Sequence, residues 1–379
     1  MANTFKFGNG NWAVKDGYAL AYNDENNNFK PLPFDFTRAS SATRVNKQGL
    51  VETVPSGKPR IDFTDNTSGH LLLEPSRTNL FTYSENIPQN FATTSITDTF
   101  EYGTSPNGEQ KSTRLQLTSV GTSRYADTLT VTSGTTYTFT CYYKGTSGET
   151  AYMYVFVSGG TSVEKEITFT GEWQREQVTF TAGSSSNLAY IVDSRRGGNA
   201  SDFEVWGTQL EVGSYATSYI PTEGSSVTRV VELMTQTPPS GIIGQTEGTL
   251  YIDFTPNTDE LTTQWLSFLG SGVNYVGIYI LSNSKIRLEV AATTNQASFD
   301  TSFTITKGQR YKCAIAYANN DFTAYVNGTQ LGTDTNGSVP ATSTIRNYYN
   351  TSSIEGTNTN DLKLYDTRLT NTELQNLTS

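Results

Sequence analysis

The sequence predicts an all-β protein: two antiparallel β-sandwich (jelly-roll) domains preceded by an irregular, turn-rich N-terminal region. Among its 379 residues are 22 Tyr and 19 Phe, although hydrophobic residues make up only 35%. Aromatic and β-branched side chains suit the pleated, half-buried surface of a sheet, and so many aromatics argue against disorder. Short alternating runs follow one another with turns and no helical period between them, which favours antiparallel sandwiches over a parallel sheet with helices.

Turn-rich stretches divide the chain into four parts. Residues 1–80 are irregular and are predicted to attach the protein to a larger particle or to pack on the jelly roll. Residues 81–236 hold runs such as "TTYTFTCYY" and "AYMYVFV" and are predicted to form that jelly roll. The Pro/Gly cluster at 237–247 indicates a linker. Residues 248–379 form a second sandwich, with a hairpin turn at Asn327–Gly328 and a short C-terminal helix capped by Thr370 or Asn371.

Two segments of the sequence share the same spacing of Thr, Gly and Tyr residues. "LTVTSGTTYTFTCYY" (129–143) and "FTITKGQRYKCAIAY" (303–317) share Thr–x–Thr–x–Gly–x–x–Tyr, followed by a strand with a cysteine at an inward position. Each predicts a strand, a Gly turn and a strand whose first Tyr enters a core; common ancestry and convergence are both open. Cys141 and Cys313 are predicted to be small buried residues rather than a disulfide, which would have to join two domains.

Charge and hydropathy exclude two classes of partner. The net charge is −10 and the pI is about 4.8, so the surface repels a phosphate backbone and nucleic acid is not expected to bind. No run of about 18 apolar residues is present, so no membrane span is predicted. The N-terminal "MANTFKFGNGNWAVKDG" lacks the pattern of a signal peptide, although such a chain can still leave a cell within a larger assembly.

Three blocks of sequence resemble known families. "FDFTRASSATRVNKQGLVETV", "PRIDF" and "LLLEPSRTNLFTYSE" (34–90) resemble a segment common in bacteriophage tail-fibre and other virion structural proteins. "WQREQVTFTA" and "FEVWGTQLEVGSYATSYIPTEGSSVTRVVE" (172–232) are similar to the end of the carbohydrate-binding-module-like jelly roll that follows that segment. "EGTLYIDFTP", "FTAYVNGTQLG" and "NDLKLYDTRLTNTELQNL" resemble a concanavalin A-like, laminin-G-type domain.

The resemblance implies a phage virion structural protein, such as a fibre, appendage or decoration, that displays lectin-like domains for adhesion to host or environmental glycans. Its expected location is the virion, after synthesis in the host cytoplasm. Its expected partners are other virion proteins, further copies of itself (with a trimer favoured) and host-surface glycans. Two alternatives stay open: a purely structural decoration or collar protein without glycan binding, and a bacterial cell-surface glycan-binding protein.

The chain is predicted not to be an enzyme. Its only histidine, His70, has no nucleophile motif around it, and one histidine with two separated cysteines cannot build a zinc site. Glycosidases of the concanavalin A-like family typically show closely spaced acids on one strand, and no such array is present. With 36 Asp and Glu residues, a suitable pair of carboxylates is not excluded by sequence alone.

Loops on a sandwich are the expected place for a glycan site, where aromatic faces and planar polar side chains meet. Two stretches carry such residues: Arg346, Asn347, Tyr348, Tyr349 and Asn350 in "RNYYNTSS", and Asn274 and Tyr275 in "SGVNYVGIY". The four tryptophans, Trp12, Trp173, Trp206 and Trp265, are better explained by core packing. Arg195 and Arg196 precede two glycines in an expected exposed turn, which could bind an acidic sugar but is by default a solvated loop.

The resemblance to carbohydrate-binding modules also implies a possible structural calcium ion. In those jelly rolls the ion often uses acids near the first and last strands, and Glu85, Glu204 and Glu211 occupy comparable places. Carboxylate oxygens are the ligands that calcium prefers. The paired Asp usual in the last strand is missing here, so the departure weakens the assignment.

The basic segment at residues 36–63 is predicted to be structural. Its Arg38, Arg44 and Arg60 lack a nucleophile, a metal-ligand set or an aromatic platform beside them. An extended wrap is expected instead, in which the arginines pair with the local acids Glu52, Asp62 and Glu74 and donate to backbone carbonyls. Arg77 is expected to join them. Trp173 and Trp206 are likewise expected to be structural.

Overall fold

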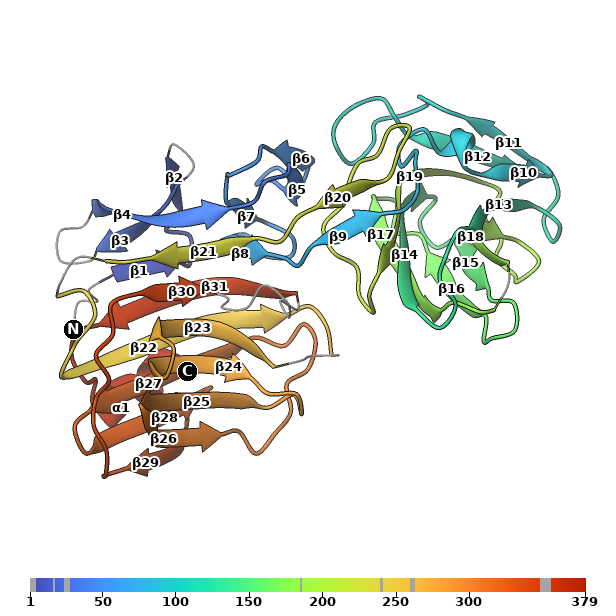
Figure 1. Ribbon diagram of the computed structural model, residues 1–379. Coiled ribbons are helices and arrows are strands. Elements are labelled where there is room, and N and C mark those ends of the chain that lie inside the picture. Colours follow the sequence, from blue (N-terminus) through green and yellow to red (C-terminus); the bar gives the residue numbers. More distant parts are fainter. Residues whose placement is uncertain are drawn as a thin grey trace. The chain divides into compact units, whose positions relative to one another are not determined.

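The structure is a computed structural model that describes residues 5–15, 18–23, 28–184, 186–238, 241–259, 263–347 and 356–379. It confirms the all-β class, because strands in antiparallel sheets dominate and α1 (Asn371–Thr378) is the one α-helix in these ranges. The chain divides into two compact units (Figure 1). Unit 1 comprises residues 1–41, 54–75 and 230–379, and unit 2 comprises residues 42–53 and 76–229.

The strands of unit 1 come from both ends of the chain. They are β1 (Phe5–Gly8), β2 (Ala13–Lys15), β3 (Tyr18–Asn23), β4 (Asn28–Thr37), β7 (Arg60–Asp62), β8 (His70–Leu73), β21 (Leu233–Gln236), β22 (Glu247–Pro256), β23 (Gln264–Ser271), β24 (Asn274–Ile280), β25 (Ile286–Ala292), β26 (Thr294–Asp300), β27 (Tyr311–Ala318), β28 (Asp321–Val326), β29 (Thr329–Asp334), β30 (Ile345–Asn347) and β31 (Thr357–Tyr365).

These strands form a sandwich whose two layers are joined along one side. One layer runs β26–β25–β24–β23–β30–β21–β4. The other runs β29–β28–β27–β22–β31–β1–β3. Strand β4 pairs with β21 through its second half and with β3 through its first half, so it carries the hydrogen bonding from one layer to the other. The predicted hairpin between β28 and β29 turns at Asn327–Gly328, where both residues have positive φ.

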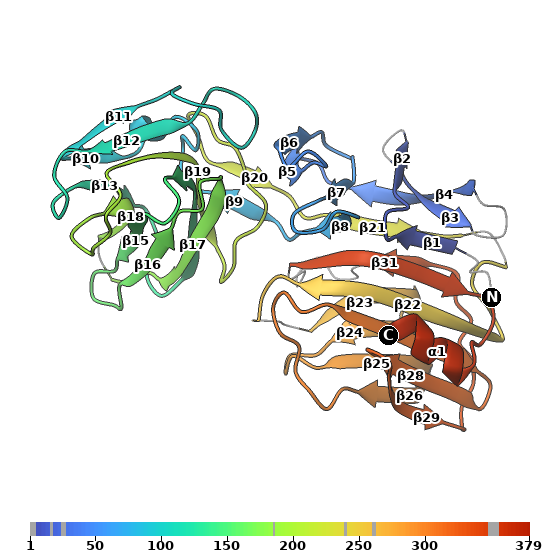
Figure 2. The same ribbon diagram turned by 180° about the vertical axis from the view of Figure 1, so that it is seen from behind.

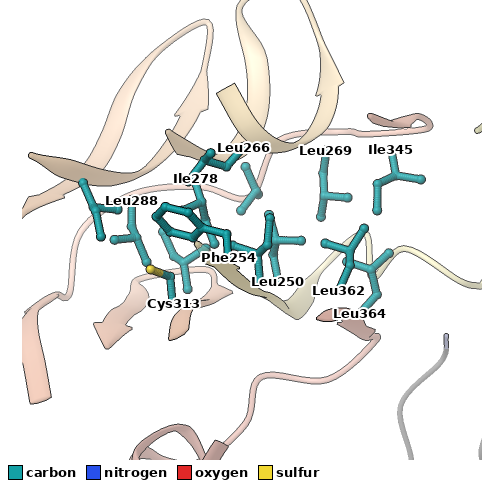
Figure 3. Close-up of a cluster of buried hydrophobic side chains, with 14 of the residues drawn as sticks. Leu250, Phe254, Leu266, Leu269, Ile278, Leu288, Cys313, Ile345, Leu362 and Leu364 are labelled. Atoms are coloured by element: carbon teal, nitrogen blue, oxygen red, sulfur yellow. The ribbon is translucent and has the colours of Figure 1, made fainter. Parts of the chain in front are cut away.

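The two layers enclose one apolar core. In Figure 3, Leu266, Leu269 and Ile345 from one layer face Leu250 and Leu362 from the other. Alternation along each strand places these side chains on the inner side of both layers. Phe7, Phe34 and Phe36 of the N-terminal strands belong to the same core.

The N-terminal region differs from the irregular segment that the sequence predicts. Its residues form strands β1 to β4, β7 and β8 of unit 1, together with a hairpin in unit 2. β1 and β8 pair with β31, and β4 pairs with β21, so three of these strands have partners more than 150 residues away that local alternation does not reveal. Residues 237–247, predicted to be a linker, connect β21 to β22 within unit 1.

Among the residues that the structure describes, a helix lies on one of the two layers. The short C-terminal helix predicted from the sequence is α1, with Thr370 as N-cap and Glu373 completing a capping box. Leu369 and Leu374 pack on Tyr251 and Tyr325 of the β22–β27–β28 layer. Figure 2 shows α1 lying on this layer. No helix in the described ranges is both long enough and apolar enough to cross a membrane.

Unit 2 is a jelly roll of two five-stranded sheets, β10–β13–β18–β15–β16 and β11–β12–β19–β14–β17. Its elements are β5 (Ala42–Val45), β6 (Val51–Val54), β9 (Arg77–Asn79), the 3-10 helix η2 (Ile87–Gln89), β10 (Ala92–Thr94), β11 (Ile96–Thr99), β12 (Thr113–Leu117), β13 (Arg124–Leu129), β14 (Thr136–Gly145), β15 (Thr150–Phe156), β16 (Val163–Thr168), β17 (Gln174–Thr181), β18 (Asn187–Asp193), β19 (Asp202–Val212) and β20 (Val227–Arg229). Cys141 in unit 2 and Cys313 in unit 1 are free and fully buried, as predicted.

Candidate glycan-binding face

The outer side of strands β23 to β26 in unit 1 carries aromatic and polar side chains in three rows. We call it the aromatic face. Strand register sets the rows: Trp265–Tyr279–Arg287–Asp300, then Arg346–Phe268–Gly277–Glu289–Ser298, then Gly270–Tyr275–Ala291–Asn295. Directly opposed residues of neighbouring strands point to the same side, so each row is a line of adjacent side chains. A register shift between Trp265 and Ser267 brings both Trp265 and Phe268 to this side.

The four aromatic rings form one cluster around Trp265. The Trp265 ring lies 4.1 Å from Tyr279, 4.9 Å from Phe268 and 5.1 Å from Tyr275, measured between ring centroids. Gly277 leaves room for it, since a Cβ at that position would meet the Trp265 ring at 2.4 Å. Phe268 and Tyr279 are buried, whereas Trp265 and Tyr275 stay half-exposed. The cluster therefore presents two aromatic side chains on a rigid base.

Glu289 is the polar centre of the aromatic face. Its carboxylate accepts hydrogen bonds from the Tyr279 hydroxyl and, at 2.6 Å, from Asn295 Nδ2. Burial, followed by the charge of Glu289, raises the pKa of Tyr275 to about 12, and burial, followed by the hydrogen bond to Glu289, also raises the pKa of Tyr279. Both tyrosines therefore keep their protons at neutral pH and act as hydrogen-bond donors beside this carboxylate.

An ion pair borders the face. Arg287 donates to both oxygens of Asp300, at 2.6 and 2.8 Å. The bond from Arg287 lowers the pKa of Asp300, which therefore stays ionised at neutral pH. Arg346 lies at the other end of the central row, opposite Phe268. Half-exposed aromatic rings with planar amide, carboxylate and guanidinium groups around them can hold a sugar ring by its C–H surface and its hydroxyls.

The sequence-predicted glycan residues only partly meet here. Tyr275 is part of the face, and Arg346 is at its end. Asn274 uses its side-chain oxygen to accept from the Thr293 backbone N–H at 2.9 Å. Asn347 is fully buried, and its Nδ2 donates to Thr359 Oγ1 at 3.2 Å, so it is part of the interior. Tyr348, Tyr349 and Asn350 lie outside the described residues.

Several members of the face were not predicted as glycan residues, among them Trp265, Tyr279, Arg287, Glu289 and Asn295. Trp265 was assigned to packing, and it does pack, but on the outer side of the sheet. A strand that alternates two aromatic residues, Tyr275 and Tyr279, around a glycine was the available signal. Glycine inside a strand often marks a place where another group approaches the backbone closely.

The three glutamates considered for calcium are not brought together. Glu85 pairs with Lys111 at 3.1 Å, Glu204 accepts from Ser112, and buried Glu211 accepts from Gln209 and Thr217. Among the residues that the structure describes, no group of three or more His, Cys, Asp or Glu side chains is placed to hold a metal ion. The calcium site stays a prediction.

The basic segment at 36–63 supplies a buried network in unit 1. Arg38 donates to Glu232 at 2.6 Å and to four backbone carbonyls, those of Ser40, Val54, Pro55 and Lys58. Arg60 donates to Glu74 at 2.8 Å and to both oxygens of Glu232. Burial alone would lower the pKa of Arg60, but the charges of Glu232 and Glu74 raise it overall.

The remaining structural candidates lie in unit 2. Arg44 pairs with Glu52 there at 2.6 Å. Arg77, expected beside Arg38, instead lies in β9, 3.8 Å from Glu211, because the chain has already left unit 1 at residue 75. Trp206 is fully buried against Tyr219, and Trp173 packs on the same cluster.

Comparisons with known proteins agree with this architecture. Residues 236–375, less than half of the chain, match the family model of the concanavalin A-like lectin/glucanases superfamily. No curated protein matches the chain. A heptameric SAP-like pentraxin from Limulus polyphemus is 18% identical (TM-score 0.29), over 35% of this chain and 70% of its own.

Two further solved structures are similar. The carbohydrate-binding module CBM40 of a Ruminococcus gnavus sialidase, bound to α2,3-sialyllactose, is 15% identical with a TM-score of 0.31, over 36% of this chain and 84% of its own. The binding domain of botulinum neurotoxin serotype D is 10% identical with a TM-score of 0.33, over 38% of each chain. The C-terminal part of unit 1 is a concanavalin A-like domain.

Proposed function

We propose that this chain is a lectin-like protein that binds glycans at the aromatic face of its concanavalin A-like domain. One observation carries the proposal: half-exposed Trp265 and Tyr275 lie beside Glu289, Asn295 and Arg287 on the layer that α1 leaves uncovered. Aromatic rings that pack on buried partners lose little entropy on binding, and planar polar groups beside them supply direction. The face therefore has both parts of a sugar site.

Binding without catalysis is the activity proposed. The superfamily includes glucanases as well as lectins, and a glycosidase needs one carboxylic acid with a raised pKa opposite a second carboxylate. On this face Asp300 is held ionised by Arg287, so it is unsuited to act as the acid. Glu289 is already engaged by Tyr279 and Asn295.

We propose that this glycan binding takes place on a phage particle. The resemblance of residues 34–90 and 172–232 to virion proteins supports a fibre, appendage or decoration in contact with other virion proteins, assembled as a homo-oligomer, with a trimer favoured. A bacterial cell-surface glycan-binding protein accounts for the lectin-like fold equally well, and a decoration without glycan binding is the remaining alternative. Immunogold labelling of intact particles separates these: label at a distal tip supports adhesion, label beneath other proteins supports scaffolding, and unlabelled particles contradict the virion role.

Glycan binding is tested with the full chain on a glycan array. The full chain is needed because β1, β3 and β4 complete the layers of unit 1. We expect Trp265→Ala to weaken binding about tenfold or more, as truncation of a central aromatic residue does in other binding sites.

Phe303→Ala is the matched control, because Phe303 is an aromatic residue of the same unit that is 41% exposed and stacks on Tyr311 rather than on this face. Equal binding by the Trp265→Ala variant and the unchanged protein would place the site elsewhere. If the unchanged protein binds no glycan on the array, the purely structural alternative is favoured.

A further inference from the structure

Unit 2 contains a groove outside the region that matches the lectin family model. It has a volume of about 480 Å³ and is lined by Tyr154, Phe156, Leu188, Tyr190, Arg195 and Arg196. The first four residues come from the neighbouring strands β15 and β18, and the two arginines come from the turn after β18. We call it the arginine groove.

Strand register places the floor of the groove on the outer side of its sheet. Tyr154 opposes Tyr190, and Phe156 opposes Leu188. The alternate residues, Val155 and Ala189 among them, belong to the core of the unit. The two tyrosine rings lie 5.3 Å apart. Phe156 is 40% exposed, so the floor offers an open apolar surface that the fold itself leaves uncovered.

Both arginines lie over the tyrosine rings. The Arg196 guanidinium carbon is 4.0 Å from the Tyr154 ring centroid, and that of Arg195 is 5.6 Å from the Tyr190 centroid. Arg195 donates to both oxygens of buried Asp193, at 2.7 and 2.5 Å, so its charge is matched within the turn. In the described part of the chain, Arg196 has one ion-pair contact, from Nε to exposed Glu164 at 3.4 Å.

The turn that carries the arginines is firmly anchored. Backbone N–H groups of Asn199 and Ala200 both donate to Thr150 O at 3.0 Å, and Ser194 N donates to Ser123 O at 2.9 Å. Gly198 has a φ of +88°, and a Cβ there would lie 2.6 Å from Thr150 O. Only glycine fits that position. The backbone hydrogen bonds to Thr150 and Ser123 anchor the turn, so the arginines are held in place before a ligand arrives.

Charge favours an anionic ligand over a neutral one. Stacking on Tyr154 fixes the plane of the Arg196 guanidinium. Its ion pair with Glu164 has Nε 3.4 Å from the carboxylate, and among the described residues its Nη groups make no hydrogen bond, so they remain to donate. A carboxylate is the bidentate partner that this geometry suits. Glu164 is 49% exposed and can leave Arg196 for water when such a ligand arrives. A polyanion such as nucleic acid is disfavoured by the net charge of −10.

We propose that the arginine groove binds a carboxylated saccharide. The apolar face of the sugar ring packs on Phe156 and Leu188, while its carboxylate accepts hydrogen bonds from Arg196. Arg195, which is bonded to Asp193, lines the groove beside Arg196. This site is independent of the aromatic face of unit 1, so the chain has two glycan sites of different chemistry.

The test is an array of uronate- and sialate-containing glycans, each printed beside its carboxyl-reduced counterpart, probed with the full chain. We expect carboxylated glycans to bind at least about tenfold more tightly than their reduced counterparts, because a charge-assisted bond contributes more than a neutral one. Arg196→Gln and Phe156→Ala should each weaken that binding about tenfold or more. Both side chains are exposed, so neither variant is expected to unfold, and circular dichroism checks this.

Arg114→Gln is the matched control in the same unit. Arg114 also pairs with a carboxylate, Asp202, and lies 4.7 Å from the Tyr102 ring centroid, but on the other sheet. Unchanged binding by Arg196→Gln, or equal binding of reduced glycans, overturns the proposal. If Trp265→Ala abolishes binding of carboxylated glycans, the aromatic face is the site and the arginine groove is not. If Arg196→Gln abolishes binding of carboxylated glycans and Trp265→Ala does not, the arginine groove is supported as the site, whatever the aromatic face binds.

Discussion

Two pairs of arginines in this molecule have similar neighbours but different roles. Arg38 and Arg60 in unit 1 are 2% and 0% exposed, and their guanidinium groups are satisfied by Glu74, Glu232 and backbone carbonyls. Arg195 and Arg196 in unit 2 have side chains that are 43% and 37% exposed. Each pair lies beside carboxylates and aromatic rings, so residue type alone does not distinguish them.

Burial and unused donors separate a structural arginine from a binding one. In unit 1 two positive and two negative side chains balance, and no ligand can reach them. A buried charge of this kind is retained only with its partners, because an unpaired one would have to be desolvated without compensation. In unit 2 the arginines face solvent, and Arg196 keeps donors that the described residues do not use.

The largest expected effect comes from removing one member of the buried network. Arg60→Ala leaves Glu74 and Glu232 buried with less positive charge beside them, which typically costs about 3–5 kcal/mol of unfolding free energy. Urea unfolding followed by fluorescence measures the loss. A loss below about 1 kcal/mol would mean that water or a rearrangement replaces Arg60, and the contrast between the two arginine pairs would then disappear.

The fold was largely predictable because its signals are local. The repeated spacing predicts the same turn in both units, and the structure has it twice: the Thr132 N–H donates to the Tyr137 hydroxyl and the Thr306 N–H to the Tyr311 hydroxyl, both at 2.9 Å. The strand predicted before each turn is wrong, because β13 ends at Leu129 and residues 301–310 form no strand. Strand alternation and Gly turns are properties of a few consecutive residues. Strands β1, β4 and β8 were missed because their partners, β31 and β21, lie far along the chain.

The sites were less predictable because their partners are distant. Glu232 accepts from Arg60 across 172 positions, so only the local acids were visible as partners. On the aromatic face, strict alternation separates Trp265 from Phe268, which are three residues apart. The register shift between Trp265 and Ser267 reverses that parity and puts both rings on the outer side. Neither a long-range pair nor a bulge is marked in the sequence itself.

A smaller, pH-dependent effect is expected beside the buried network. Burial lowers the pKa of His70 below its ordinary value of about 6.5, although Asp62, 3.6 Å away, opposes the shift. The unfolded chain therefore binds the proton more readily than the folded one. Stability from neutral His70 is fully present above about pH 6.5 and is lost as the pH falls toward the lower folded pKa.

The comparison of unchanged protein with His70→Gln isolates this contribution. Unfolding free energies of both are measured at pH 7.5 and at pH 5.5. We expect the unchanged protein to lose more stability between these two values than the variant does, because glutamine does not titrate. Equal losses would show that His70 is as easily protonated in the folded protein as in the unfolded chain.

The smallest effect is expected at Arg44, which tests whether exposure alone separates the two kinds of arginine. Arg44 belongs to the same basic segment as Arg38 and Arg60 and also pairs with a glutamate, Glu52, but their side chains are 28% and 38% exposed. An exposed ion pair typically contributes about 0–1 kcal/mol and is screened by salt. Arg44→Gln should therefore cost less than about 1 kcal/mol in urea unfolding, and less still in 1 M salt. A loss as large as that of Arg60→Ala would mean that position within the segment, rather than burial, decides what its arginines do.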